Sequence, residues 1–381
     1  MKRYLQSNIF DDLNKKMIVL TGPRQVGKTY LSQQLMKNYI NPVYLNYDNY
    51  NHASIIRNYS WLPISDYIVL DELHKMPEWK AYLKGLYDTK RKEQSLLVTG
   101  SARMDTFRQT GESLAGRYFH YRLHPLSVSE LKEQMSADEA LIMLNRLGGF
   151  PEPFLSGSER EASRWRNQYF TDIIREDILD FSRIQEVRSI KLLVELLRER
   201  TGSPLSLNSL AGDLQISPHT VRKYLEILES LYVVFLIRPY HRNIARSLLK
   251  EPKVYFFDSA YIKGDEGARL ENTVACCLLK HCHYQQDLEG RNMKLSYLRT
   301  KDKREVDFLI SENDLPTEMI EVKFSDKNLS KQLLYFKERY PHIKAVQIVQ
   351  NLMQEEYRKE KDVYIRKAGL YLSELDFSSP P

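Results

Sequence analysis

The sequence predicts an α/β chain that begins with a parallel β-sheet covered by helices. Short apolar runs of buried-strand type at residues 43–47, 67–70 and 95–99 alternate with segments of helical spacing. Such alternation of strand and helix produces a parallel sheet with helices on both faces. A further apolar run at residues 17–21 leads directly into a loop with two glycines and then into a helical pattern. We therefore place a parallel-sheet domain at residues 1–125.

The loop after the first strand has the spacing G-x-x-x-x-G-K-T. Its residues are Gly22, Pro23, Arg24, Gln25, Val26, Gly27, Lys28 and Thr29, with Tyr30 next to them at the start of the helix. The two glycines let the backbone curl with its N–H groups inward, and the helix adds the positive end of its dipole. Strand, glycine loop and helix in this order are typical of a phosphate-binding loop, or P-loop. We expect it to bind a nucleoside triphosphate, with Lys28 at the β- and γ-phosphates and Thr29 at Mg²⁺.

An acidic pair follows the strand at residues 67–70. Asp71, at the carboxyl end of that strand, is expected beside the P-loop, where it would hold Mg²⁺ through water. Glu72 would orient and deprotonate the attacking water, so it is the predicted general base. Acidic pairs are common wherever a strand meets a loop, but the position after a P-loop favours the functional interpretation.

Two further residues near the nucleotide site have both a catalytic and a structural interpretation. Ser101 follows the strand at 95–99 and is predicted to sense the γ-phosphate, with helix capping as the alternative. Arg117 precedes an aromatic strand and is predicted to be an arginine finger, which stabilises the charge that develops during phosphoryl transfer. The sequence leaves open whether Arg117 serves its own site or that of another copy in a homo-oligomer, and an ordinary surface arginine is the alternative.

The middle of the chain is predicted to be a connector at residues 126–157 and a helical region at 158–245. Dense glycine and proline at the end of the connector indicate a turn between domains. Helices at 205–214 and 217–230, followed by a strand at 233–238, give the pattern of a winged helix. If this module contacts DNA, the exposed residues of its second helix are His219, Arg222 and Lys223. A plain packing module is the alternative.

The last segment, residues 246–381, contains a group of acidic residues and a lysine. A predicted hairpin brings Asp307 beside Glu321 and Lys323, which share one face of a strand, and Glu271 opens a helix upstream. Carboxylates in such a group can hold a divalent metal ion, while a lysine activates water or stabilises phosphate charge. The pattern is short and arises by chance, so ordinary surface charges are the alternative.

Composition narrows the class of protein. The chain has 381 residues and a net charge of +6, a mild excess that permits contact with DNA without demonstrating it. No run of about 18 apolar residues is present, so we expect no membrane span. Three cysteines do not make a disulfide framework, which favours a cytoplasmic location.

Taken together, these motifs resemble those of predicted ATPases that join an AAA-type P-loop domain to a region called DUF4143. The resemblance rests on residues 22–29, 70–72, 99–101, 114–117, 148–151, 304–308 and 321–323. It implies that the nucleotide is ATP, that the middle region is a winged helix, and that residues 246–381 are similar to PD-(D/E)xK nucleases, which have a restriction-endonuclease-like α/β fold. In that resemblance Glu271, Asp307, Glu321 and Lys323 fall where such a nuclease keeps its metal-binding acids and lysine. The second-sensor arginine of many AAA ATPases is not found.

The leading functional hypothesis is an ATPase that couples nucleotide hydrolysis to a nucleic-acid-related activity of its C-terminal half. The first alternative is an ATP-gated, metal-dependent DNA endonuclease with a second divalent metal ion in its C-terminal domain. The second is a nucleotide-dependent signalling switch that recruits a protein partner.

Overall fold

The computed structural model describes residues 1–100, 114–173, 184–241, 250–325, 328–375 and 377. The chain divides into two compact units, Met1–His124 and Pro125–Pro381. In the part of the chain that the structure describes, no helix combines the length and the apolar character that crossing a membrane requires.

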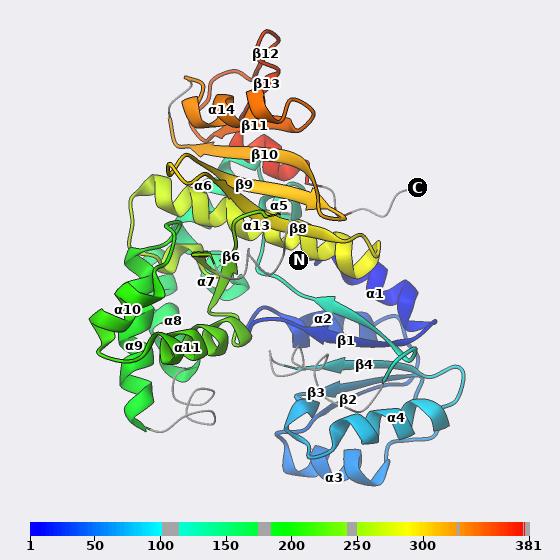
Figure 1. The fold of residues 1–381 in the computed structure, drawn as a ribbon. Coiled ribbons are helices and arrows are strands. Elements are labelled where there is room, and N and C mark those ends of the chain that lie inside the picture. The colour runs from blue at the N-terminus through cyan, green and yellow to red at the C-terminus, as the bar shows by residue number, and fades with distance from the viewer. Residues whose placement is uncertain (101–113, 174–183, 242–249, 326–327, 376, 378–381) are drawn as a thin grey trace. The chain divides into compact units, whose positions relative to one another are not determined.

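The first unit is built on a five-stranded parallel sheet. Its strands are β1 (Met17–Thr21), β2 (Pro42–Asn46), β3 (Tyr67–Asp71), β4 (Ser95–Thr99) and β5 (Tyr118–Arg122). Their order across the sheet is β2-β3-β4-β1-β5, and every neighbouring pair is parallel (Figure 1). The carboxyl ends of the neighbouring strands β3, β4 and β1 therefore lie side by side.

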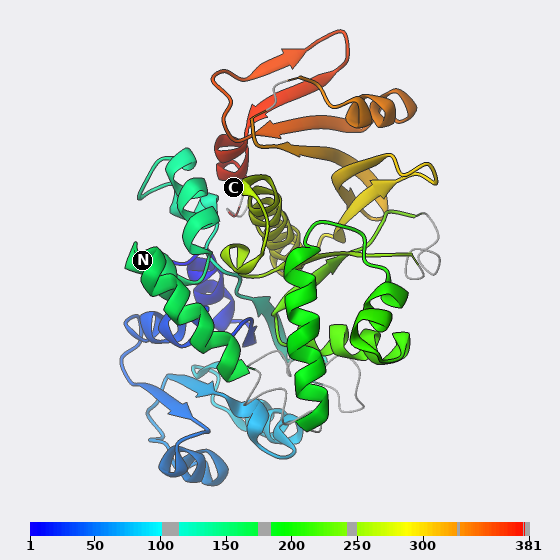
Figure 2. The ribbon, with the colours of Figure 1, turned by 90° about the vertical axis from the view of Figure 1, so that its left-hand side faces the viewer.

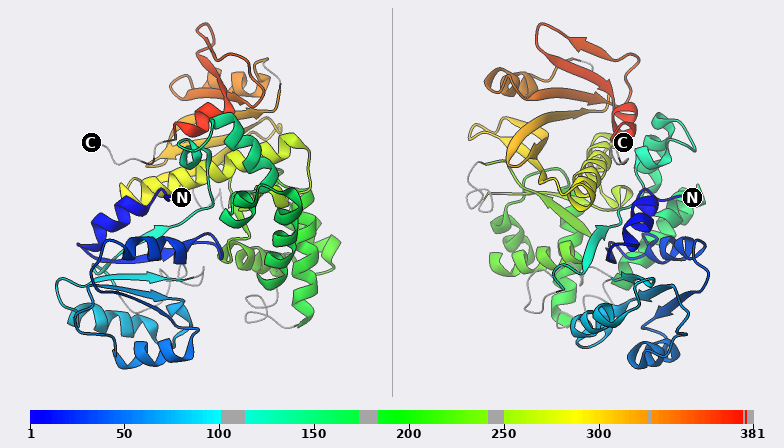
Figure 3. Two further views of the ribbon diagram at one scale, coloured as in Figure 1. Left: turned by 180° about the vertical axis from the view of Figure 1, so that it is seen from behind. Right: turned by 90° about the vertical axis from the view of Figure 1, so that its right-hand side faces the viewer.

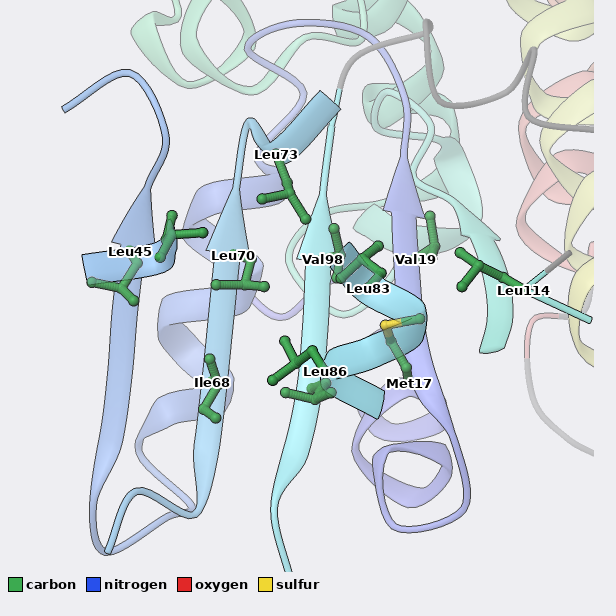
Figure 4. Close-up of a cluster of buried hydrophobic side chains, with 12 residues drawn as sticks. Met17, Val19, Leu45, Ile68, Leu70, Leu73, Leu83, Leu86, Val98 and Leu114 are labelled. Atoms are coloured by element: carbon green, nitrogen blue, oxygen red, sulfur yellow. The ribbon is translucent and has the colours of Figure 1, made fainter. Parts of the chain in front are cut away.

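Helices cover this sheet. They are α1 (Gln6–Leu13), α2 (Lys28–Met36), α3 (Tyr50–Asn58) and α4 (Trp79–Thr89), with a 3₁₀ turn η1 (Leu73–Lys75). All residues of β1, β3 and β4 are buried, as expected for parallel strands with both faces covered. Figure 4 shows alternate strand side chains, such as Met17 and Ile68, packed with Leu83 and Leu86 of α4. The α/β fold class predicted for this part of the chain is confirmed.

The second unit begins with helices and a short hairpin. The helices are α5 (Val128–Leu131), α6 (Ala137–Leu147), α7 (Pro151–Ser156), α8 (Glu159–Asp172), α9 (Ile184–Glu199), α10 (Leu207–Leu214) and α11 (Pro218–Ser230), and the hairpin strands are β6 (Val234–Ile237) and β7 (Lys253–Phe256). A tight turn joins α10 to α11, which starts with Ser217 as its N-cap and Pro218 in its first turn. Helices α9, α10 and α11 group together in Figure 2. Two helices, a turn and an antiparallel hairpin follow one another in the order that the predicted winged helix requires, and the winged helix itself stays a prediction.

The β6–β7 hairpin crosses the domain boundary predicted at residue 245. Strand β7 pairs with β6 from Val234↔Phe256 to Ile237↔Lys253, and Lys253 also forms a bridge with Pro204. On the other side, Tyr240 donates its backbone N–H to the carbonyl oxygen of Tyr297. Pairing between strands far apart in sequence thus joins the winged-helix pattern to the C-terminal part of the second unit.

The remainder of the second unit contains a six-stranded mixed sheet. Its elements are η4 (Ser259–Tyr261), α13 (Glu266–Leu288), β8 (Met293–Arg299), β9 (Glu305–Glu312), β10 (Leu315–Lys323), α14 (Lys331–Arg339), β11 (Lys344–Val349), β12 (Glu356–Arg358), β13 (Val363–Lys367) and α15 (Ala368–Ser373). The strand order is β12-β13-β11-β10-β9-β8, and the long helix α13 runs along the sheet (Figure 3). The chain is thus α/β in both units, while the likeness of this sheet to restriction endonucleases stays a prediction.

The glycine-rich segment before α7 has a packing role. Gly148 has a φ of +81°, and a Cβ atom built on it would lie 2.0 Å from Oδ1 of Asp258. Asp258 is buried and forms an ion pair of 2.6 Å with the buried guanidinium of Arg166. A side chain at position 148 would therefore strain the backbone and displace a buried charge pair.

Candidate functional site

The loop between β1 and α2 has the backbone of a phosphate-binding cradle. Gly22 and Gly27 adopt φ values of +145° and +100°, in the region that favours glycine, and Gln25 has a φ of +58°. A Cβ atom on Gly22 would lie 2.3 Å from the carbonyl oxygen of Leu123, so the loop can approach that segment only without a side chain. Gly27 is the N-cap of α2, which places the amino end of that helix at the loop.

The side chain of Lys28 folds back onto the loop that precedes it. Its ammonium group donates hydrogen bonds to the carbonyl oxygens of Gly22 at 2.9 Å and Pro23 at 2.7 Å. The residue is 7% exposed. An ammonium group at the centre of the loop is positioned to exchange these carbonyl oxygens for phosphate oxygens.

The carboxylate of Asp71 is the point where three strands and the P-loop meet. Its Oδ2 accepts hydrogen bonds from the hydroxyls of Thr29 at 2.8 Å and Tyr44 at 2.5 Å. Its Oδ1 accepts from the hydroxyl of Thr99 and from the backbone N–H of Glu72. Burial, and then the hydrogen bond to Asp71, raise the pKa of Tyr44 to about 12, so its hydroxyl stays protonated as a donor. A hydroxyl and a carboxylate in contact here form an oxygen donor set of the kind that Mg²⁺ prefers.

Glu72 lies next to this cluster in a strained backbone conformation. Its φ is +55°, which is uncommon for a residue other than glycine and is found at functional sites. Burial raises the pKa of its carboxyl above the ordinary value, and the nearby ammonium of Lys28 partly opposes that rise. The Nδ1 atom of His74 lies 3.5 Å from its Oε2 atom. A partly buried carboxylate with a raised pKa is a stronger base than an exposed one, as general-base catalysis requires.

Sequence reasoning missed Arg3, a buried residue that braces the P-loop. Its guanidinium donates to the carbonyl oxygens of Val26 at 2.6 Å and His124 at 2.5 Å, and the side chain is 3% exposed. It thereby joins the P-loop to the segment after β5. Tyr44 was missed as well, because nothing in its strand marks a hydroxyl that reaches the carboxylate of Asp71 on the adjacent strand.

Arg117 lies at the amino ends of the strands, whereas the P-loop lies at their carboxyl ends. It precedes β5, its carbonyl oxygen accepts the N–H of Met17 at the start of β1, and β1 runs parallel to β5 toward the loop. The five residues of β1, at about 3.3 Å each, separate these two ends by about 17 Å. The guanidinium pairs with Asp88 through two hydrogen bonds of 2.7 and 3.0 Å. Arg117 therefore faces away from the P-loop of its own chain.

The other residues predicted to bind nucleotide all lie on the same loop and helix start. Pro23 and Val26 are buried, Arg24 is half-buried, and Gln25 and Tyr30 are exposed. Ser101, the predicted sensor, lies outside the described residues. Thr99, two positions earlier on β4, is the hydroxyl that contacts Asp71.

In the second unit, the predicted acids lie close together. Asp307 on β9 accepts the backbone N–H of Val322 on β10 at 2.9 Å, as expected for the predicted hairpin. Burial, and then the charge of Asp307, raise the pKa of both Glu271 and Glu321. Lys323 forms an ion pair of 2.8 Å with Glu321. Among the described residues, no group of three or more His, Cys, Asp or Glu side chains is arranged to hold a metal ion.

Lys253 enters the same cluster from β7 and was not predicted. Its ammonium lies 2.7 Å from Oε1 of Glu305, 3.4 Å from Oε1 of Glu271 and 3.6 Å from Oδ1 of Asp307. Burial alone would lower the pKa of Lys253, but the three carboxylates outweigh it and raise that pKa. The residues predicted to meet DNA, His219, Arg222 and Lys223, are all exposed on α11.

The parallel sheet, its P-loop and the acidic pair beside that loop define a P-loop NTPase domain. Residues 14–132 match the family described as "AAA domain". Residues 138–263 match a domain of unknown function, DUF8612, and residues 266–370 match the domain of unknown function DUF4143. The matches to the AAA domain and to DUF4143 are the two that the resemblance implied.

Two curated relatives match the chain at low identity. An uncharacterized protein of Mycobacterium tuberculosis is 28% identical over 250 residues, which are 65% of this chain and 55% of that protein. The chain thus spans about half the length of this relative. An uncharacterized protein of Haemophilus influenzae is 22% identical over 382 residues, 90% of this chain and 92% of its own.

Two solved structures are similar to this chain at a low level. The Walker-type ATPase of Pyrococcus abyssi is 14% identical with a TM-score of 0.45 and covers 68% of this chain and 94% of its own. The Holliday junction branch migration motor RuvB of Thermotoga maritima is 17% identical with a TM-score of 0.31, over 60% of this chain and 86% of its own.

Proposed function

We propose that this chain is an Mg²⁺-dependent ATPase of AAA type whose turnover is coupled to a nucleic-acid-related activity of its C-terminal half. The observation that carries the ATPase part is the 2.8 Å hydrogen bond between the hydroxyl of Thr29 and Asp71. It joins the P-loop to the acidic end of β3, which is where a P-loop NTPase holds its metal ion. The choice of ATP as the nucleotide rests on the match to the AAA domain.

Each residue of the cluster then has a chemical role. Lys28 would exchange the two loop carbonyl oxygens for phosphate oxygens, and Thr29 and Asp71 would hold Mg²⁺. The metal ion, when bound, neutralises charge on the phosphates. Glu72 would accept a proton from the attacking water, for which its raised pKa is suited. The hydroxyls of Tyr44 and Thr99 fix the Asp71 carboxylate in place.

The test compares nucleotide binding with phosphate release. We expect Lys28→Ala to lose ATP binding, and Glu72→Gln to bind ATP while its turnover falls about 10²–10⁴-fold, the usual contribution of a general base. Glu78→Gln is the matched control, because Glu78 is an exposed glutamate in the same left-handed backbone conformation outside the site. Unchanged turnover in Glu72→Gln would remove Glu72 as the base. Negligible turnover in the wild type, with nucleotide retained through purification, would instead favour the signalling switch.

The nucleic-acid part of the proposal is supported by the winged-helix pattern. Helix α11 presents His219, Arg222 and Lys223 on its exposed side, where the second helix of such a module meets a DNA groove. Cationic side chains that contact phosphates displace counterions, which makes binding weaken steeply with salt.

Fluorescence anisotropy with single-stranded, duplex and branched DNA at several salt concentrations tests this part. We expect Arg222→Ala/Lys223→Ala to weaken binding and to lower the slope of log K against log salt by about 0.9 per lost phosphate contact. Lys359→Ala/Lys361→Ala, which removes two exposed lysines near β12, is the matched control. Phosphate release measured with the same DNA panel identifies which form stimulates turnover. DNA affinity equal in all three proteins would exclude α11 as the binding element.

A further inference from the structure

The acid cluster of the second unit already contains a cation that belongs to the chain. Lys253 is 1% exposed, and its ammonium lies within 3.6 Å of oxygens from three carboxylates. Those carboxylates come from two elements, Glu271 from α13 and Glu305 and Asp307 from β9. A buried ammonium in contact with carboxylates is a stable arrangement, because its own charge is paired.

Several oxygens of these acids also accept hydrogen bonds from donors of the protein other than Lys253. Oε1 of Glu271 accepts the Tyr255 hydroxyl at 2.6 Å as well as the Lys253 ammonium. Oε2 of Glu305 accepts from Arg299 at 2.7 Å. Oδ2 of Asp307 accepts the backbone N–H of β10 at 2.9 Å. The neighbouring Glu321 is engaged separately, by Lys323 and by the hydroxyl of Ser330 at 2.9 Å.

A divalent metal ion does not fit this arrangement. Mg²⁺ and Ca²⁺ require several oxygens at about 2.0–2.6 Å, with those oxygens turned toward the ion. Here the carboxylates converge on the Lys253 nitrogen, and a second cation among them would be repelled by that ammonium at close range. We infer that Lys253 takes the place of a metal ion in this cluster, so that the C-terminal unit holds no divalent ion there and does not cleave phosphodiester bonds by a metal-dependent route.

The cluster instead has a structural role. Lys253 belongs to β7 of the winged-helix hairpin, and its partners belong to α13 and to β9 of the six-stranded sheet. The ion pairs therefore join the hairpin to the sheet. Gly202, which precedes α10, lies against the same cluster, since a Cβ atom there would lie 3.0 Å from Oε1 of Glu271.

The test counts Mn²⁺ ions bound to the nucleotide-free full-length chain by electron paramagnetic resonance. An ion at the P-loop is common to all variants and cancels in the comparison. We expect the wild type and Asp307→Asn to bind equal numbers of ions, and Lys253→Met to bind one more. That extra ion should disappear in Lys253→Met/Asp307→Asn. Lys250→Met is the matched control, because Lys250 is an exposed lysine just before β7, and it should behave as the wild type does.

Thermal unfolding gives a second readout that does not depend on catalysis. Removal of the ammonium leaves three carboxylates facing one another, so Lys253→Met should melt well below the wild type. Addition of Mn²⁺ should raise its melting temperature by several degrees more than that of the wild type. Recovery of folded Lys253→Met only in the presence of Mn²⁺ would support the inference equally.

Three results would overturn the inference. The first is loss of one Mn²⁺ ion on Asp307→Asn in the otherwise wild-type chain, which needs no change at Lys253. The second is a folded Lys253→Met protein that gains no ion. The third is metal-dependent DNA cleavage by the wild type that Asp307→Asn abolishes. Glu305→Gln gives the same comparison as Asp307→Asn if the latter does not fold.

Discussion

The position of Arg117 leads to a prediction about how the ATPase site is completed. Arg117 lies at the amino end of β5, about 17 Å from the P-loop at the other end of the strands, so the predicted arginine finger would have to act on another copy of the chain. An arginine finger contributes about 10³–10⁵-fold to turnover. We therefore expect Arg117→Ala to lower phosphate release by about 10³-fold or more while ATP binding is retained, and wild-type turnover per chain to rise with protein concentration.

A mixing experiment separates action between copies from action within one. Arg117→Ala retains Glu72 but supplies no finger, and Glu72→Gln supplies the finger but has no base. Each variant alone should release phosphate slowly, whereas an equimolar mixture should recover a substantial fraction of wild-type turnover. Recovery arises because sites on the Arg117→Ala chains receive Arg117 from Glu72→Gln neighbours.

The ion pair with Asp88 supplies the control. Asp88→Asn removes the same exposed pair and leaves the arginine in place. A purely structural arginine predicts similar effects in Asp88→Asn and Arg117→Ala, whereas a catalytic arginine predicts lost turnover in Arg117→Ala alone. Turnover of Arg117→Ala equal to the wild type, or a mixture no more active than the sum of its parts, would refute the reasoning.

Two further predictions concern stability. Burial raises the pKa of Glu229 from 4.5 to about 7, so the folded state keeps a proton that the unfolded chain loses, and stability falls as the pH rises through this window. Glu229→Gln should remove that fall, which is worth about 3 kcal/mol, in denaturant unfolding compared at pH 4 and pH 8, and equal pH dependence in both proteins would contradict it. Gly148→Ala should cost about 2–5 kcal/mol, since it adds a clash with Asp258 to the strain of a positive φ. Gly157→Ala, with φ +65° and nothing within 4 Å of the added atom, should cost about 1–2 kcal/mol, and equal losses in the two variants would show that the clash is unimportant.

The parts of the site that the sequence predicts are those encoded in short contiguous strings. The P-loop is a local structure, since Gly22, Gly27 and Lys28 belong to one short loop of the chain. Asp71 could be placed beside the P-loop because the carboxyl ends of parallel strands all lie at the same end of the sheet, whatever the exact strand order. The start of helix α11 was predictable for a similar reason, because the cap at Ser217 and the proline at position 218 mark it locally.

The parts that the sequence could not predict depend on contacts across the fold. Arg3 contacts a carbonyl oxygen 121 residues away, and an arginine near the start of a chain carries no signal of burial. Tyr44 reaches Asp71 because β2 lies beside β3, a fact that depends on the strand order alone. Lys253 was not predicted because the boundary predicted at residue 245 separates its strand from β6. The apolar residues that follow it, Val254 to Phe257, were the available signal for β7.

The shared use of β7 has a mechanical consequence. This strand is the second strand of the winged-helix hairpin. Its Lys253 also forms an ion pair with Glu305, the first residue of β9 in the six-stranded sheet. Under the proposed function, a movement of either module that is driven by nucleotide turnover is expected to carry the other module with it. A fragment cut between them would divide the hairpin and separate Lys253 from its three carboxylates, so we expect the smallest stable fragment downstream of the P-loop domain to include both modules.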